Sequence, residues 1–212
     1  MIELRNVVVA YESRVILDSI NLTIDDGETL VILGGSGSGK STLLRLLIGL
    51  QRPTSGQIIV DGTDITTLSE DEFNTVRRKM GMVFQYSALF DSMSVGENVA
   101  FGLRQHTKLG EDEIKRIVAE RLDWVGLKGY ESYMPNELSG GMKKRVSLAR
   151  AIALDPSLIL YDEPSSGLDP ITSGTISMLI KGMQNRLGCT SIVVKHDMQS
   201  CLLYTSDAAD EE

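Results

Sequence analysis

The chain contains, at residues 34–42, the stretch Gly34-Gly35-Ser36-Gly37-Ser38-Gly39-Lys40-Ser41-Thr42. Residues 34–41 fit the pattern G-x-x-x-x-G-K-[ST], which is typical of a phosphate-binding loop. An apolar run at 29–33 precedes the loop, as expected of a strand, and a second apolar run at 43–48 follows it, as expected of a helix. A strand, this loop and a helix in that order predict a nucleotide site in an α/β fold.

The residue types of the loop explain why it would hold phosphate. Glycines let several backbone N–H groups turn toward one centre without Cβ clashes, and the helix N-terminus behind them adds partial positive charge. Lys40 is then expected to reach the β- and γ-phosphates, and the Ser41 hydroxyl to bind Mg²⁺. The alternative is a flexible Gly/Ser linker, but a linker has no need of Gly-Lys-Ser at a strand–helix junction.

Composition narrows the class of protein. The 212 residues, 42% hydrophobic and 24% charged, suit one globular domain with a core. No apolar run is long enough to cross a membrane, and residues 1–5 lack the pattern of a signal peptide. Cys189 and Cys201 give no disulfide framework and suit a reducing compartment. The net charge of −8 argues against a nucleic-acid partner.

Residues 201–212 stand apart from the rest of the chain. Residues 201–211 resemble the translated end of a transposon-based sequencing adapter, so we expect them to be foreign to the fold. The alternative is a native acidic tail, because the stretch holds four acidic residues and no Lys or Arg. On the first interpretation the native sequence stops near Ser200, and the C-terminal part of the fold is truncated.

Hydrophobic runs and turn signals give the order of the elements. A β-rich opening precedes the loop, a mostly helical stretch covers 86–150, and strand, helix and strand follow. The alternation around a phosphate loop predicts a parallel sheet covered by helices. We expect strands at 2–9, 15–17, 20–24, 29–33, 57–60, 81–84, 158–161 and 190–194, with a turn near Asp18, and helices at 43–48, 69–78, 111–127 and 170–187.

Two acidic residues, Asp162 and Glu163, end the apolar run at 158–161. A buried parallel strand has such a continuous apolar run, and side chains at its C-terminal end face the ligand crevice of an open α/β sheet. Asp162 is expected to hold Mg²⁺, and Glu163 to orient and polarise the attacking water. The alternative is a pair of ordinary exposed acids at a strand end.

A second candidate anion site lies at Ser139-Gly140-Gly141, at the start of a predicted helix. One nucleotide does not need two such sites from one chain. The second site makes sense if it caps the γ-phosphate of a nucleotide bound by another copy, which predicts a two-fold dimer. A plain N-cap with a glycine-rich turn is the alternative, and it would be preferred if the motif stood alone.

Taken together, these motifs make the chain resemble the ATPase subunits of ATP-binding cassette (ABC) transporters over essentially all of residues 1–200. Residues 34–41 are similar to the Walker A loop, Asp162 and Glu163 to the Walker B acid and catalytic glutamate, and residues 138–142 to the signature motif. The resemblance implies roles for further residues. Tyr11, which could equally be a partly buried aromatic, would stack on adenine; Gln85 would be the Q-loop glutamine, Asp169 part of the D-loop at 166–169, and His196 the switch histidine.

The family resemblance implies a site built by two copies. Its catalytic residues would be Lys40, Glu163 and His196, and its metal ligands Ser41, Gln85 and Asp162. The remaining nucleotide contacts would come from Tyr11, Gly34, Gly35, Ser36, Gly37, Ser38, Gly39, Thr42, Ser139, Gly140, Gly141 and Asp169.

The resemblance also implies a P-loop NTPase fold with a parallel core sheet, an antiparallel β subdomain and a helical subdomain. The core and β subdomain would take residues 1–85 and 151–200, and the helical subdomain, with the signature motif, residues 86–150. Residues 201–212 would form the foreign tail.

Two departures from the family pattern narrow the resemblance. The signature ends in Met142 where glutamine is usual, and Lys195 precedes His196 where a small hydroxyl residue is common. Leu-Ser-Gly-Gly-Met, with the residues after Gln85 and after Asp169, is similar to the Mla/Mce-type lipid-transport ATPases. That likeness implies a homodimer under membrane permease subunits, on the cytoplasmic face of a bacterial inner membrane, working with an Mce-type lipid-binding protein. The alternatives are an ATPase of another importer or exporter, for example of amino acids, and a soluble protein acting on DNA or ribosomes.

Overall fold

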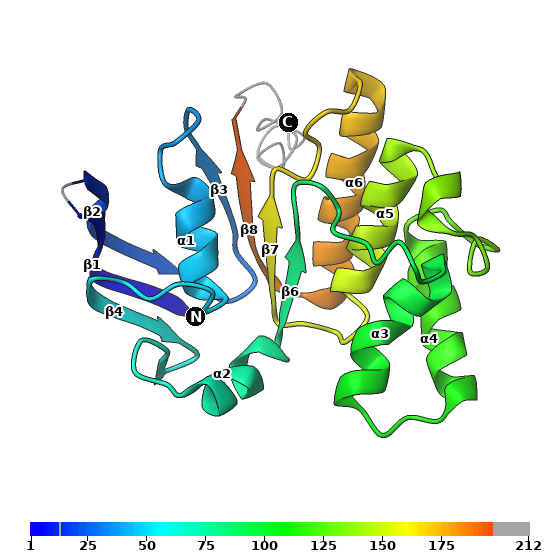
Figure 1. The fold of residues 1–212 in the computed structure, drawn as a ribbon, viewed down its shortest axis with the longest axis horizontal. Helices are drawn as coiled ribbons and strands as arrows, with labels where there is room; N and C mark the ends of the chain where they lie inside the picture. Colours follow the sequence, from blue (N-terminus) through cyan, green and yellow to red (C-terminus); the bar gives the residue numbers. More distant parts are fainter. Residues whose placement is uncertain (13, 197–212) are drawn as a thin grey trace, which may run out of the picture.

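The computed structural model describes residues 1–12 and 14–196 of the chain. The predicted foreign tail at 201–212, and the predicted end of the native sequence near Ser200, lie outside the described residues. Within them the expected order of strands and helices is largely reproduced, as Figure 1 shows.

Two four-stranded sheets form the framework. The core sheet is parallel, in the order β3-β8-β7-β6, with β3 at Thr29–Leu33, β6 at Met80–Val83, β7 at Leu158–Asp162 and β8 at Thr190–Lys195. The second sheet is antiparallel, in the order β2-β1-β4-β5, with β1 at Ile2–Tyr11, β2 at Arg14–Ile24, β4 at Ser55–Val60 and β5 at Thr63–Asp64. The prediction of a parallel core sheet beside an antiparallel β unit is confirmed.

The strand β2 differs from the prediction. Two strands with a turn near Asp18 were expected, but one strand runs from Arg14 to Ile24 along β1. The pairing of β1 with β2 shifts its register at the polar residues Asp18 and Ser19, and Ser19 has a φ of 48°. Bulges of this kind let a strand continue past residues that break its alternation, so the turn prediction was wrong.

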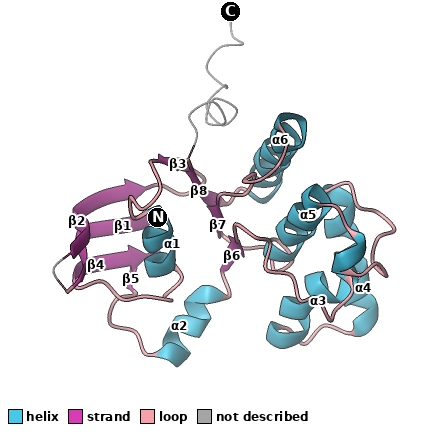
Figure 2. Ribbon diagram, turned by 45° about the horizontal axis from the view of Figure 1, so that its top comes forward, coloured by secondary structure: helices cyan, strands magenta, loops and turns pink. Residues whose placement is uncertain are grey.

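Helices cover both faces of the core sheet. The residues of β7 alternate: Leu158 and Leu160 join the core cluster that includes α1, and Ile159 and Tyr161 join the cluster that includes α5 and α6. Figure 2 shows α1 (Lys40–Leu47) between the two sheets, with α5 (Gly140–Ala151) and α6 (Pro170–Leu187) on the opposite side. A strand buried on both faces explains its continuous apolar sequence.

A layer of helices packs outside α5. It contains α3 (Val95–His106) and α4 (Glu111–Trp124), followed by the short 3₁₀ turn Pro135–Glu137. The helix α2 (Glu70–Arg77) lies near the antiparallel sheet and begins at the predicted N-cap Ser69, which forms a capping box with Glu72. Within residues 1–12 and 14–196, no helix combines the length and apolarity needed to span a bilayer.

Candidate nucleotide-binding site

The candidate site lies at one edge of the core sheet, where all four parallel strands end. The strand β3 leads into residues 34–39 and then α1, β6 leads to Gln85, β7 to Glu163, and β8 to His196. Parallel strands bring their carboxyl ends to one edge, which is where open α/β sheets bind ligands. The topology therefore gathers four predicted site elements that are far apart in the sequence.

The glycine-rich loop requires glycine for steric reasons. Gly37 and Gly39 have φ angles of 79° and 90°, in the left-handed region that other residues rarely adopt. A Cβ on Gly39 would lie 2.8 Å from Cδ2 of Leu17. The loop can therefore hold this shape, with its backbone turned toward one centre, only because glycines occupy these positions.

Lys40 is 7% exposed and points back into the loop. Its Nζ donates to the carbonyl oxygens of Gly34, at 2.6 Å, and Gly35, at 2.8 Å. The ammonium also lies 3.4 Å from Nδ1 of His196. A buried cation is thus held at the centre of the loop, where a phosphate group would need it.

Ser41 and Asp162 form a direct link between the loop and the core strand β7. The Ser41 hydroxyl donates to Oδ1 of Asp162 at 3.1 Å. Across residues 1–12 and 14–196, no group of three or more His, Cys, Asp or Glu side chains could hold a metal ion by itself. A hydroxyl and a carboxylate fit Mg²⁺, which prefers oxygen and is commonly held by one or two carboxylates together with substrate phosphates.

Glu163 lies at the centre of the catalytic candidates. It is 8% exposed and has a φ of 47°, and its backbone N–H donates to the Val194 carbonyl at 3.0 Å. Its carboxylate accepts a hydrogen bond of 3.0 Å from Nε2 of Gln85 and is in contact with Nε2 of His196. Strained backbone conformations at non-glycine residues cluster at functional sites, and a carboxylate held this way suits a general base.

A hollow of about 550 Å³ lies beside Lys40, Ser41 and Glu163. The volume lies in the range of small-molecule sites. Tyr11 lines the hollow and is 54% exposed, which leaves its ring open to a ligand. From the predicted set, Tyr11, Ser36, Gly37, Ser38, Gly39, Lys40, Ser41, Thr42, Gln85, Glu163 and His196 line it, joined by Arg14, Ile16, Arg45 and Tyr86.

Of these four additional residues, Arg45 has a signal in the sequence. It lies on α1 four residues after Ser41, so helix periodicity places both side chains on the same face. Arg14 and Ile16 lie on β2, whose approach to the loop depends on the pairing of distant strands and has no local signature.

The predicted signature and D-loop residues lie at two helix starts and do not line this hollow. Ser139 is the N-cap of α5, and its hydroxyl accepts from the Met142 N–H at 3.3 Å. Asp169 is the N-cap of α6 and accepts from the N–H and the hydroxyl of Thr172, bonds that hold the pKa of Asp169 below its usual value. A Cβ on Gly141 would lie 2.7 Å from Cγ2 of Thr172, so the two helix starts are in close contact.

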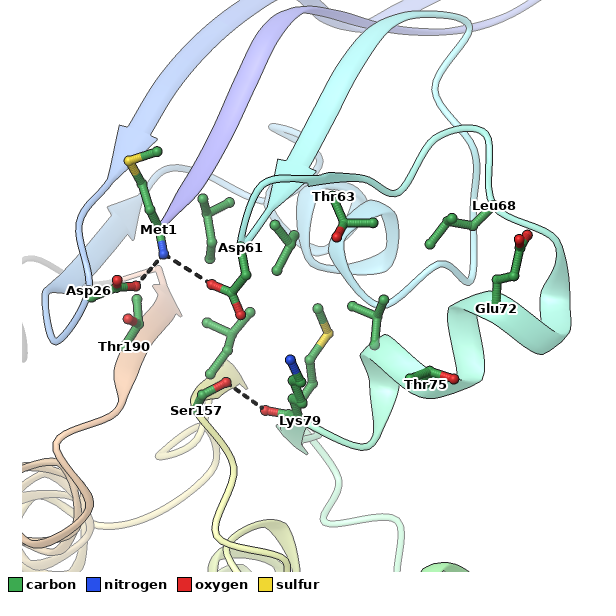
Figure 3. Close-up of a pocket in the computed structure, with 15 residues that line it drawn as sticks. Met1, Asp26, Asp61, Thr63, Leu68, Glu72, Thr75, Lys79, Ser157 and Thr190 are labelled. Carbon is green, nitrogen blue, oxygen red and sulfur yellow. Dashed lines mark hydrogen bonds and ion pairs between the residues drawn. The ribbon is translucent and has the colours of Figure 1, made fainter.

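A second hollow, of about 380 Å³, opens at the opposite edge of the core sheet (Figure 3). Its rim carries the Met1 ammonium, which pairs with Asp26 and Asp61. Residues such as Ile2 and Leu158 give it an apolar floor, and none of the phosphate-loop residues lines it. It therefore lacks the chemistry of a nucleotide site.

Comparisons with known proteins agree with this geometry. A family model described as "ABC transporter" matches residues 17–166. The intermembrane phospholipid transport system ATP-binding protein MlaF of Haemophilus influenzae is 50% identical over 202 residues, which cover 95% of this chain and 76% of that protein. The probable ribonucleotide transport ATP-binding protein mkl of Mycobacterium tuberculosis is 48% identical over 197 residues, covering 93% of this chain and 55% of that one.

Solved structures show the same fold. The dimeric, post-hydrolysis structure of the ATP-binding cassette MJ0796 bound to ADP and Pi has a TM-score of 0.88 and 35% sequence identity to this chain. The match covers 96% of this chain and 91% of that one. The likeness extends to almost every described element.

Proposed function

This chain belongs to the ABC transporter family, and from that premise we propose that it powers the movement of phospholipid between two bacterial membranes. The family match makes the chain an ABC-type ATPase, and the role of each residue and the transported lipid are our proposal. The observation that carries the enzymatic part is the contact of Glu163 with both Gln85 and His196 beside the phosphate loop.

In the proposed mechanism, the loop and Lys40 hold the β- and γ-phosphates of ATP, and Tyr11 stacks on the base. Glu163 accepts a proton from the attacking water, while Gln85 and His196 fix the orientation of its carboxylate. Lys40 stabilises charge that develops on the transferring phosphoryl group. Ser41, Asp162 and the Gln85 side-chain oxygen would hold Mg²⁺, which when bound supplies further neutralisation of the phosphate charge.

The working unit in this proposal is a homodimer. Ser139, Gly140 and Gly141 begin α5 outside the hollow, as a group that completes the site of another copy would. Asp169 begins α6 beside them and would lie at the same interface. The MJ0796 cassette was solved as a dimer with ADP and Pi, which supports the same arrangement here.

The lipid assignment rests on MlaF at 50% identity and on the signature ending in Met142. It implies permease subunits, an Mce-type lipid-binding partner and a position on the cytoplasmic face of the inner membrane. The mkl relative at 48% identity supports a second candidate cargo, ribonucleotides. The two relatives have similar identities to this chain and each covers more than 90% of it. Sequence similarity alone therefore does little to distinguish phospholipid from ribonucleotide as the cargo.

Two experiments test the proposal. Glu163→Gln should lower the rate of ATP hydrolysis by roughly 10²–10⁴-fold while ATP binding is retained, because only proton acceptance is lost. Full turnover in that variant would remove Glu163 from the role of base. For the cargo, the ATPase with the permease encoded beside its gene is reconstituted in vesicles with labelled phospholipid. ATP-dependent lipid transfer supports the proposal, and transfer of labelled nucleotide instead would favour the second candidate.

A further inference from the structure

Side chains of α5 hold the backbone that follows Gln85. Lys144 is only 5% exposed, and its ammonium donates to the Gln85 carbonyl oxygen. Arg150, six residues further along the same helix, donates to the carbonyl oxygens of Ser87, at 2.8 Å, and Ala88, at 2.6 Å. Two cations of one helix thus bind three carbonyls of one short segment.

The segment they hold is strained. Ser87 and Ala88 have φ angles of 64° and 47°, in the left-handed region, and neither is glycine. Consecutive residues in that region persist only where their surroundings fix them. The bonds from α5 supply part of that restraint, so the position of Gln85 depends on this helix.

The other side of Gln85 faces the catalytic candidates. Its side-chain Nε2 donates to Glu163 at 3.0 Å and reaches the Ser166 hydroxyl at 3.4 Å. Burial lowers the pKa of Lys144, and attraction by Glu163 and Asp162 opposes that change. Burying a lysine is costly unless the ammonium is bonded, and this one is bonded to the residue that contacts Glu163.

We propose that Lys144 is a positioning residue for ATP hydrolysis, acting through the Gln85 backbone to hold the Gln85 amide on Glu163. Lys144 does not touch the reacting atoms. Because it lies little more than one turn after Ser139–Gly141, it links the start of α5 to the catalytic carboxylate of the same chain. A movement of α5 is then transmitted to Glu163 through two hydrogen bonds, from Lys144 to the Gln85 carbonyl and from the Gln85 amide to Glu163. The inference rests on the proposed function of Glu163.

The experiment compares Lys144→Met, Lys144→Arg and the charge-matched control Lys115→Met, which lies at an exposed position of α4. In steady-state ATP hydrolysis, Lys144→Met should lower kcat by about 10- to 100-fold and change KM less than about 2-fold, because a small misplacement of a catalytic group is costly. Lys144→Arg keeps a donor for the carbonyl and should recover kcat to within about 3-fold of the original chain. Lys115→Met should leave both constants unchanged.

A double-mutant cycle identifies the route. In a Gln85→Ala background, Lys144→Met should cause less than about a 2-fold further loss, because the side chain through which it acts is gone. The inference would be overturned if Lys144→Met lowered kcat as much in the Gln85→Ala background as in the original chain. An unchanged kcat in Lys144→Met alone would also overturn it. The inference would also be overturned if Lys144→Met lowered both kcat and Tm and Lys144→Arg restored neither. That result would show a purely structural role for Lys144.

A readout without catalysis separates this inference from the proposed function. Amide hydrogen exchange in residues 86–90 should be about tenfold faster in Lys144→Met and unchanged in Lys115→Met, because the restraint on the segment is lost. Unchanged exchange would refute the inference. The two results can also differ. If exchange is faster in Lys144→Met but Glu163→Gln hydrolyses ATP at the full rate, the proposed role of Glu163 is refuted and the restraint by Lys144 is retained.

Discussion

Replacing Asn98 by alanine should be among the most destabilising single changes in the helical layer. Asn98 lies in the first turns of α3 and is fully buried. Its Oδ1 accepts from the Phe90 N–H at 2.8 Å, and its Nδ2 donates to the carbonyl oxygens of Phe90, Met93 and Ser94 at 3.0–3.1 Å. One side chain therefore fixes the loop between Gln85 and α3.

The magnitude follows from these bonds. Alanine would leave the Phe90 N–H without its acceptor, at a cost of about 1–3 kcal/mol if it stays buried. The Nδ2 group carries two hydrogens, so about two carbonyl bonds are lost, each worth roughly 0.5–1.5 kcal/mol. We expect a total loss of about 3 kcal/mol in the free energy of unfolding, and a fall in Tm of roughly 6–12 °C for a domain of this size.

Urea denaturation and thermal melting measure the effect. The control is Gln105→Ala on the same helix, an exposed residue that should change the free energy of unfolding by less than about 0.5 kcal/mol. Hydrogen exchange should also accelerate in residues 88–94 of the Asn98 variant before the rest of the protein opens. A loss equal to that of the control would show that water or a rearranged loop satisfies these groups, and it would refute the reasoning.

Two further predictions concern packing and thiol chemistry. Gly81→Ala should lower the free energy of unfolding by about 1–3 kcal/mol, because its Cβ would lie 2.5 Å from the Ala151 carbonyl oxygen. Gly174→Ala, with open space around it, should not destabilise the protein, and urea denaturation measures both variants. Burial raises the pKa of the Cys189 thiol, so at pH 8, in a Cys201→Ser background, it should react with a thiol reagent only after urea unfolds the chain; rapid labelling of the folded protein would contradict this.

Local patterns were enough to predict much of the fold. The apolar run at 158–161 ending in two acids predicts a buried parallel strand, and the structure places β7 between two others. Ser69, followed by three acidic residues, predicts the start of α2. Such signals are readable because the hydrogen bonds and the burial they describe involve neighbouring residues.

Contacts between distant segments were not predictable in the same way. The turn expected near Asp18 is absent because pairing of β2 with β1 continues through a bulge, and only the partner strand shows this. Lys144 is the middle residue of a basic run at 143–145, for which the sequence predicted no role. It is buried because the Gln85 carbonyl, 59 positions away, lies against α5. Helix periodicity can place Lys144 on a buried face, but only the tertiary fold shows which group it must satisfy, and that group connects it to the candidate catalytic carboxylate.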